Sequence, residues 1–300
     1  MSGRHRAAVL GHPIAHSLSP VLHHAAYAAL GLTGWSYQAV DVDEAGLPDF
    51  LAGLDGSWAG LSLTMPLKRA VRPLLVAESP LAAAVGAVNT VTFTDAGPVG
   101  HNTDVAGIVA ALRESGVTRV ARAAVLGGGA TATSAVAALR ELGCDRPTVH
   151  ARRLSTTGDL RAAAARLGSA PVLTGLDADG LALLGDAEVV VSTLPGAAAD
   201  LLAEPLLGAA AAGGRPGSAL PVLLDVVYAP WPTVLAGRWQ VAGGRVVGGF
   251  AMLLHQAGEQ VRLMTGRAAP LEAMRRAGEA EIATRTGGPN GGQAAGGMRR

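Results

Sequence analysis

The sequence has very few residues of three types: one cysteine, Cys144, one lysine, Lys68, and few aromatic residues. A single cysteine excludes an intramolecular disulfide and a cysteine-rich metal site. Aromatic residues make up 3% of the 300 residues although 49% are hydrophobic, so the core must consist mainly of alanine, valine and leucine. This composition favours an α/β protein, and the length is sufficient for two domains.

An excess of charge is also lacking, because the formal net charge is +1 and both signs are interspersed. The sequence therefore has no extended basic stripe for nucleic acid or for an anionic membrane. No apolar run is long enough to span a membrane, and residues 1–9 do not form a signal-peptide pattern. We expect a cytoplasmic protein with a small-molecule partner. The oligomeric state stays open, with a homodimer among the alternatives.

The single lysine stands against 23 arginines. Arginine stays protonated at any workable pH, whereas a lysine ammonium can release and rebind a proton in a suitable environment. An arginine-biased composition could also leave one lysine by accident. Only the sequence around Lys68 can distinguish a catalytic lysine from an accidental one.

Hydrophobic periodicity predicts an α/β unit in roughly the first hundred residues. The expected strands and helices are strands at 7–11, 35–42 and 60–64, helices at 20–30, 46–54 and 67–76, and a hairpin of 88–94 with 98–102.

A second α/β unit is predicted to begin with a helix at 106–115. Its expected strands are 123–126, 148–151, 189–192 and 222–227. These strands are continuous and apolar, as is typical of a parallel sheet covered on both faces. Helices are expected at 250–265 and 271–284, and the glycine-rich residues 286–300 are predicted to be disordered. The alanine- and glycine-rich pattern of 197–221 predicts no definite layout of helices and strands.

A glycine turn follows the strand at 123–126 and precedes a helix that extends to about Leu142. Gly127, Gly128 and Gly129 would let the backbone approach a pyrophosphate, which the N-terminus of the next helix would also attract. Ala132 replaces the usual third glycine of this pattern. A tight turn with no ligand is the alternative interpretation of this feature.

The next strand ends in Arg152 and Arg153, where a carboxylate would be needed to accept a bond from a ribose 2′-hydroxyl. Two guanidinium groups suit a 2′-phosphate instead, which favours NADP over NAD. Arginines that end a strand in solvent are the alternative interpretation.

Six segments together resemble the shikimate dehydrogenase family over about residues 6–280. They are 11–23, with Ser17 and Ser19 before a helix; 60–68, ending in Lys68; 86–90, with Asn89; 100–104, ending in Asp104; and the pair 225–230 and 249–257. The resemblance implies two domains: residues 1–105 with the helices of 247–285 for the substrate, and a Rossmann-like NADP domain at 106–246. It further implies an oxidoreductase of chorismate and aromatic amino acid biosynthesis, which reversibly reduces 3-dehydroshikimate to shikimate.

The resemblance also assigns roles to residues. Lys68 and Asp104 would be catalytic, and the substrate would be bound by Ser17, Ser19, Thr64, Lys68, Asn89, Asp104, Tyr228 and Gln256. The cofactor would be bound by Gly127, Gly128, Gly129, Ala130, Arg152, Arg153, Thr193, Val226, Gly249 and Met252. Reduction of a ketone needs a hydride on carbon and a proton on oxygen, and Lys68 can supply the proton while Asp104 orients the ammonium.

Three positions depart from the family pattern: Ser62 and His24, where asparagine is common, and Ala151, where asparagine usually precedes the arginine. Ser62 has a shorter reach to a substrate hydroxyl, so a quinate or aminoshikimate dehydrogenase using NAD or NADP is an alternative. A non-catalytic metabolite sensor is an alternative of another class. The histidines at 16, 23 and 24 lack acidic or cysteine partners, so we predict no metal.

Overall fold

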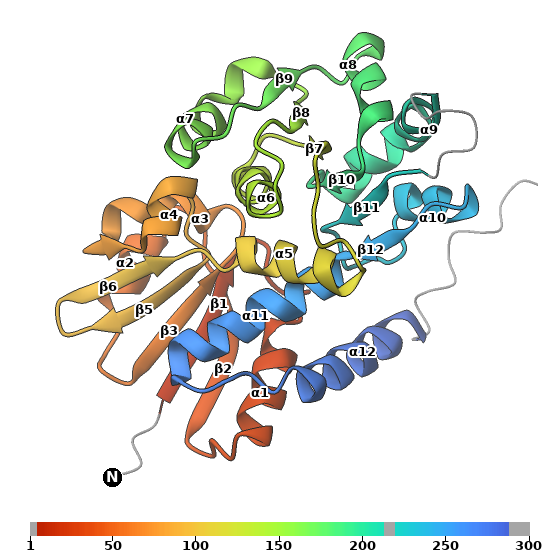
Figure 1. The fold of residues 1–300 in the computed structure, drawn as a ribbon. Helices are drawn as coiled ribbons and strands as arrows, with labels where there is room; N and C mark the ends of the chain where they lie inside the picture. The colour runs from red at the N-terminus through yellow and green to blue at the C-terminus, as the bar shows by residue number, and fades with distance from the viewer. Residues whose placement is uncertain (1–4, 213–219, 288–300) are drawn as a thin grey trace, which may run out of the picture.

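The computed structural model describes residues 5–212 and 220–287, which form two sheets with helices around and between them (Figure 1). The strands of the first sheet have the order β2-β1-β3-β5-β6-β4. They are β2 (Trp35–Asp41), β1 (His5–Gly11), β3 (Trp58–Leu63), β5 (Thr90–Thr94), β6 (Gly97–His101) and β4 (Ala77–Glu78). Strand β1 is parallel to β2 and β3, whereas β5 is antiparallel to β3 and β6.

The helices of this part are short except for the first. They are α1 (Ser19–Ala29), α2 (Leu47–Ala52), α3 (Leu67–Ala70) and α4 (Pro80–Val85). The prediction of one helix over 67–76 was wrong, because α3 ends at Ala70 and a 3-10 turn, Arg72–Leu74, follows. Pro73 lies in that turn and has no N–H to continue an α-helix.

The second sheet is parallel throughout, in the order β12-β11-β10-β7-β8-β9. Its strands are β7 (Ala123–Leu126), β8 (Thr148–His150), β9 (Val172–Thr174), β10 (Val189–Ser192), β11 (Val222–Asp225) and β12 (Val246–Gly248). Numbered along the chain, this is the 3-2-1-4-5-6 order of dinucleotide-binding sheets, whose order reverses between β7 and β10. The predicted α/β class with a Rossmann-like part is confirmed.

Helices cover both faces of this second sheet, as its apolar strands predicted. They are α5 (Asp104–Glu114), α6 (Ala130–Glu141), α7 (Gly158–Leu167), α8 (Ala178–Ala182), α9 (Gly196–Ala212) and α10 (Val234–Val241), with short 3-10 turns at Leu154–Thr156 and Leu183–Asp186. One core cluster joins α5, α6 and α7 to one face, and another joins α8, α9 and α10 to the opposite face. Both cores consist mainly of alanine, valine and leucine, as the scarcity of aromatic residues required.

Helix α5 lies between the two sheets, where it packs against α6 and α11 (Figure 1). It begins at Asp104, two residues earlier than predicted, so the expected domain boundary after residue 105 falls in its first turn. Helix α11 (Gly249–Thr265) and helix α12 (Leu271–Gly287) end the described chain, and α12 packs against α1. Residues 213–219, and residues 288–300 of the predicted disordered tail, lie outside the described residues.

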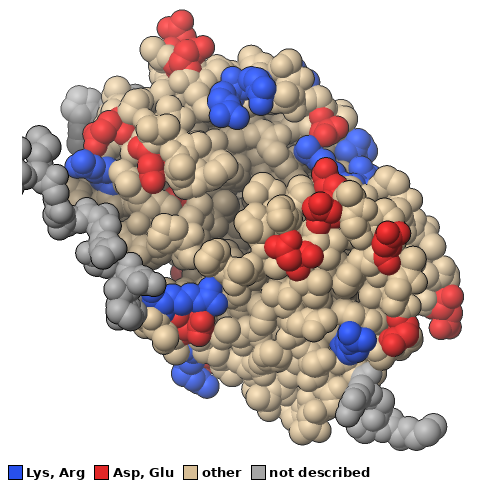
Figure 2. Space-filling view, turned by 180° about the vertical axis from the view of Figure 1, so that it is seen from behind, with Lys and Arg blue, Asp and Glu red and all other residues tan. Residues whose placement is uncertain are grey.

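Basic and acidic side chains are interspersed on the face shown in Figure 2, which is hollowed near its centre. Among residues 5–212 and 220–287, no helix combines the length and apolarity needed to cross a membrane. In the same ranges, no three histidine, cysteine, aspartate or glutamate side chains cluster as metal ligands would.

Candidate active site

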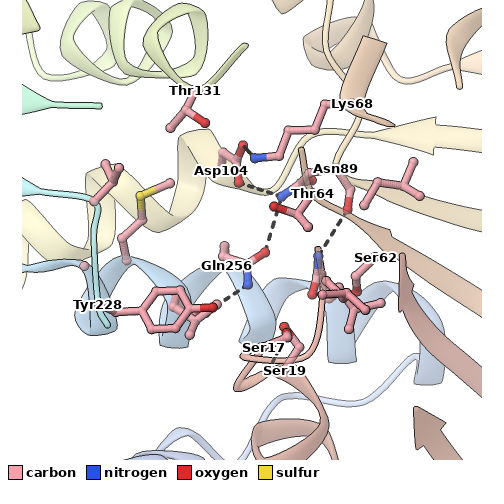
Figure 3. A pocket seen from close by; sticks show the side chains of 18 of the residues that line it. Ser17, Ser19, Ser62, Thr64, Lys68, Asn89, Asp104, Thr131, Tyr228 and Gln256 are labelled. Atoms are coloured by element: carbon pink, nitrogen blue, oxygen red, sulfur yellow. Dashed lines mark hydrogen bonds and ion pairs between the residues drawn. The ribbon is translucent and has the colours of Figure 1, made fainter. Parts of the chain in front are cut away.

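A cavity of about 290 Å³ collects side chains from both parts of the chain (Figure 3). The substrate residues predicted from the sequence all line it: Ser17, Ser19, Thr64, Lys68, Asn89, Asp104, Tyr228 and Gln256. The same cavity is lined by Thr131, which follows the glycine turn, and by Val226, Gly249 and Met252. A ligand in this cavity would therefore touch both the first sheet and the elements of the second.

Lys68 and Asp104 form an ion pair in this cavity, with 2.5 Å between Lys68 Nζ and Asp104 Oδ2. Their side chains are 14% and 5% exposed, so solvent screens the pair only weakly. Asp104 is the first residue of α5, where the positive end of the helix dipole favours a carboxylate. The ammonium of Lys68 thus binds Oδ2 of Asp104, and Oδ1 of the same carboxylate can accept a hydrogen bond from a different donor.

Asn89 is that donor, since its Nδ2 lies 2.8 Å from Asp104 Oδ1. Its Oδ1 accepts a hydrogen bond of 2.7 Å from the backbone N–H of Thr103. Asn89 is 1% exposed and immediately precedes β5. The alternative that Asn89 only bonds its own turn is therefore wrong: it joins the first sheet to the N-terminus of α5 and orients Asp104.

Helix α11 presents two glutamines to the cavity. Gln256 Oε1 lies 3.3 Å from Asn89 Nδ2, whereas the neighbouring His255 pairs with Glu114 at 2.6 Å on another side of the helix. Gln260, one turn later, was not predicted. It lines the cavity, accepts a bond of 2.9 Å from Ser62 Oγ, and is 1% exposed. Its spacing of four residues from Gln256 was a signal that could have identified it.

Hydroxyl groups gather at the end of the cavity near α1. Ser17 Oγ accepts a bond of 3.2 Å from the backbone N–H of Ser19, the first residue of α1. The N-cap of α1 is Leu18, which has no side-chain cap, so the alternative that these hydroxyls only cap the helix is wrong. Burial raises the pKa of Tyr228, which keeps its phenol protonated as a donor. Behind them, Tyr37 donates a bond of 2.6 Å to Ser62 Oγ. Ser17, Ser19 and Tyr228 are neutral groups suited to an anionic oxygen.

The glycine turn follows β7 at the point where the strand order reverses, which is where open α/β sheets bind ligands. Gly127 has a φ of +119°, and a Cβ there would clash with Thr193 Oγ1. Gly129 faces open space, with no atom within 4 Å of the position of a Cβ. No side chain caps the N-terminus of α6, which begins at Ala130. This open cradle of backbone N–H groups fits a pyrophosphate.

The remaining predicted cofactor residues lie at successive places around this turn. Arg152 and Arg153 are exposed directly after β8, whereas Thr193 follows β10 and donates a bond of 2.8 Å to Leu126 O. Gly128 packs near Thr157, with 3.3 Å between a Cβ placed there and the threonine methyl. Thr131, in the first turn of α6, lines the cavity and was not predicted, although its place just after the glycines could have suggested it.

Two family models match the chain: the shikimate dehydrogenase substrate binding domain over residues 9–91, and the shikimate 5′-dehydrogenase C-terminal domain over residues 249–277. A relative named shikimate dehydrogenase (NADP(+)), from Moorella thermoacetica, is 36% identical over 95% of this chain and 96% of its own.

Solved structures agree with these matches. A shikimate dehydrogenase from Mycobacterium tuberculosis has a TM-score of 0.82 and 43% identity, covering 92% of this chain and 99% of its own. The enzyme from Thermus thermophilus, solved in complex with NADP(H) and shikimate, has a TM-score of 0.75 and 32% identity, with the same coverage of both chains. With identity above 30% over nearly the full length, the chain belongs to the shikimate dehydrogenase family.

Proposed function

We propose that this protein is an NADP-dependent shikimate dehydrogenase, which reversibly reduces 3-dehydroshikimate to shikimate in aromatic amino acid biosynthesis. The observation that carries the proposal is the Lys68–Asp104 ion pair inside a polar cavity that adjoins an open dinucleotide cradle. A relative named shikimate dehydrogenase (NADP(+)) aligns with almost the whole chain, and a similar enzyme was solved in complex with NADP(H) and shikimate.

The polar lining matches the functional groups of shikimate, which has one carboxylate and three hydroxyls. We assign the carboxylate to Ser17, Ser19 and Tyr228, whose hydroxyl groups can all donate to it. The ring hydroxyls are assigned to the amide and charged groups on the opposite side, which are Lys68, Asn89, Asp104 and Gln256, with Thr64 between the two sets. A ring held at both ends would present one carbon in a fixed orientation.

NADPH, when bound, supplies the hydride for the carbonyl carbon. Lys68 donates a proton to the developing alkoxide oxygen, and it takes the proton back when shikimate is oxidised. Asp104 accepts the hydrogen bond of the ammonium and holds Nζ in position while its charge changes. Asn89 fixes the carboxylate from its other oxygen, so that Asp104 need not rotate during the reaction.

The cofactor residues support NADP by the chemistry they offer. The open face at Gly129 and the uncapped α6 would bind the pyrophosphate, and we assign the 2′-phosphate to Arg152 and Arg153, which are exposed after β8. Thr193, Val226, Gly249 and Met252 are proposed to contact the ribose and nicotinamide, because the last three line the cavity beside the substrate residues.

Initial rates of nicotinamide reduction test the proposal, with shikimate, quinate and aminoshikimate each offered alongside NADP⁺ or NAD⁺ at equal concentration. We expect the highest kcat/KM for shikimate with NADP⁺. A higher value for quinate or aminoshikimate would reassign the substrate, and ligand binding without turnover would support the sensor alternative. A cytoplasmic location and a homodimer stay predictions, the latter to be measured by light scattering during size-exclusion chromatography.

A further inference from the structure

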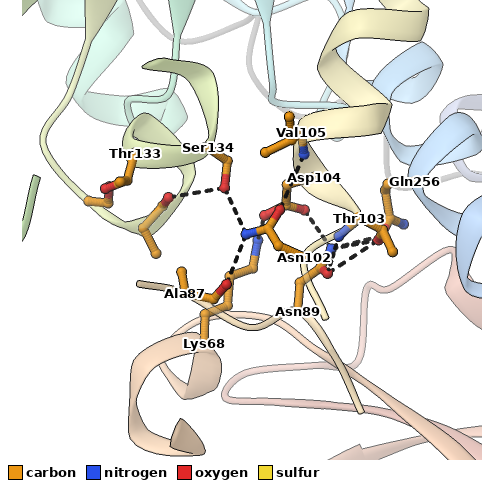
Figure 4. Close-up of polar contacts among 12 residues, drawn as sticks. Lys68, Ala87, Asn89, Asn102, Thr103, Asp104, Val105, Thr133, Ser134 and Gln256 are labelled. Atoms are coloured by element: carbon orange, nitrogen blue, oxygen red, sulfur yellow. Dashed lines mark hydrogen bonds and ion pairs between the residues drawn. The ribbon is translucent and has the colours of Figure 1, made fainter. Parts of the chain in front are cut away.

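Asn102 occupies a buried junction behind the ion pair rather than a place in the cavity (Figure 4). It is 6% exposed, and its side chain binds three separate segments. Its Nδ2 donates to Ala87 O at 2.9 Å and to Ser134 Oγ at 3.1 Å, while its Oδ1 accepts from the backbone N–H of Val105 at 3.2 Å. Both amide protons of this side chain are therefore used.

Two of these bonds hold backbone segments that contact or carry the catalytic pair. Val105 follows Asp104 in the first turn of α5, so Asn102 fixes the backbone on which that carboxylate stands. Ala87 precedes Val88, whose N–H donates 2.8 Å to the backbone oxygen of Lys68. Asn102 thus supports Lys68 and Asp104 from behind, each through one intervening backbone segment.

The third bond reaches the helix of the dinucleotide cradle. Ser134 is fully buried in α6, one turn after Ala130, the residue that begins this helix next to Gly129. A ligand that draws the N-terminus of α6 toward itself would carry Ser134 with it, because the helix moves as a unit. The Asn102–Ser134 bond joins that displacement to the support of the ion pair.

We propose that Asn102 is a positioning residue that couples occupation of the cofactor cradle to the geometry of Lys68 and Asp104, with Ser134 as its contact on α6. The inference rests on the proposed function and adds to it a defined path between the two ligand sites. Coupling of this kind is reciprocal: each ligand must tighten the binding of the other by the same factor.

Calorimetry of shikimate binding, without NADPH and with saturating NADPH, measures this factor and involves no turnover, because shikimate and NADPH are both reduced. We expect shikimate to bind at least about fivefold more tightly with NADPH in the unmodified protein, the lower end of common coupling factors. In Ser134→Ala the ratio is expected to fall to within about twofold of one, because the bond between α6 and Asn102 is lost while the other two bonds of Asn102 remain.

Ser169→Ala is the matched control. Ser169 is also a buried hydroxyl in the second part of the chain, and its Oγ donates 2.8 Å to Asp145 O, with no bond to Asn102. The control should keep the full ratio, and unchanged thermal melting should show that both variants are folded. Asn102→Ala is a second variant, expected to lower the ratio as well as kcat. Combining it with Ser134→Ala should lower the ratio no further, because the same bond is already absent.

A ratio in Ser134→Ala equal to that of the unmodified protein would overturn the inference, as would a ratio of one in the unmodified protein. In both cases turnover of shikimate would still uphold the proposed function. Failure of the unmodified protein to bind or oxidise shikimate would instead refute the proposed function, and with it the inference.

Discussion

Lys68 Nζ lies 2.5 Å from Asp104 Oδ2, although 36 residues separate the two positions in the chain. The lysine stands on the short helix α3 after the first parallel strands, and the aspartate begins the helix that packs against α6 and α11. The ion pair therefore bridges the substrate side of the molecule and the elements that carry the glycine turn.

Replacing Lys68 tests its role as the proton donor. Lys68→Ala should lower kcat for shikimate oxidation by ~10²–10⁴, the usual contribution of a positioned acid or base. Lys68→Arg should not restore the rate, because a guanidinium keeps its protons. Steady-state rates measure both, and Arg69→Ala is the control, since Arg69 pairs with Asp159 instead, at 3.0 Å. A fully active Lys68→Arg variant would refute proton transfer by this residue.

Removing the arginines after β8 tests the choice of NADP over NAD. Arg152→Ser and Arg153→Ser are each expected to raise the KM for NADP⁺ by about tenfold, the effect of one lost charge-assisted hydrogen bond. The KM for NAD⁺ should hardly change, because NAD⁺ has no 2′-phosphate. Arg161→Ser, an exposed change on α7, is the control. Equal losses with both cofactors would mean that the arginines do not read the 2′-phosphate.

Two glycines of the turn should respond differently to alanine. Gly127→Ala should lower both the melting temperature and NADP⁺ affinity, because φ is +119° and the new Cβ would clash with Thr193. Gly129→Ala should leave the melting temperature unchanged, since its φ is −85° and the space is open, yet weaken NADP⁺ binding by filling the cradle. Thermal melting with and without NADP⁺ distinguishes the two, and unchanged binding in Gly129→Ala would argue against the cradle.

Ser62 is expected to influence substrate preference. It is 3% exposed, lines the cavity, and binds both Tyr37 and Gln260. Ser62→Ala would remove the hydrogen bonds of these two buried groups to Ser62, which should lower the free energy of unfolding by about 1–3 kcal/mol. We expect a higher KM for shikimate, an unchanged KM for NADP⁺, and a different ratio of kcat/KM between shikimate and quinate. Tyr37→Phe removes the same bond from behind the cavity, and an identical shift in both variants would show that the effect is only structural.

Stability should fall in mild acid because of His23. Burial lowers the pKa of this fully buried histidine to about 4, and its Nδ1 lies 2.9 Å from the carbonyl oxygen of Ser19. In the unfolded chain, this histidine binds a proton near its ordinary pKa of 6.5. Its contribution to the free energy of unfolding is therefore complete above that pH and is lost as the pH falls toward 4. Between these two pKa values, the free energy of unfolding is expected to fall by about 1.4 kcal/mol for each pH unit.

Denaturant unfolding between pH 7.5 and 4.5 measures this slope. Burial also lowers the pKa of His150 to about 4, so this second histidine should add to the effect. His23→Asn should reduce the slope, whereas His5→Asn, a change at an exposed position, should leave it as it is. A slope that is the same in all three proteins would exclude His23 as its source.

Much of the site was predictable because its signals are local in the chain. The glycine turn between an apolar strand and a helix, the arginines at 152 and 153, and the segments around Lys68, Asn89 and Asp104 depend on residues within a few positions of one another. The boundaries of helices were less predictable, because the same residues can form either the end of a helix or an adjoining turn. Proline at 73 shortened one predicted helix, and α5 begins two residues early, which places Asp104 in its first turn.

The sequence by itself determined the α/β class, the two kinds of sheet and the set of polar residues available for catalysis, because periodicity and composition are properties of the chain. Tertiary structure decided which of them meet. Gln260 bonds Ser62 across 198 residues, and Asn102 bonds Ser134 from a different element. The first pair forms only when α11 packs on β3, and the second only when α6 packs against α5, so the chain order does not show which partner each residue meets.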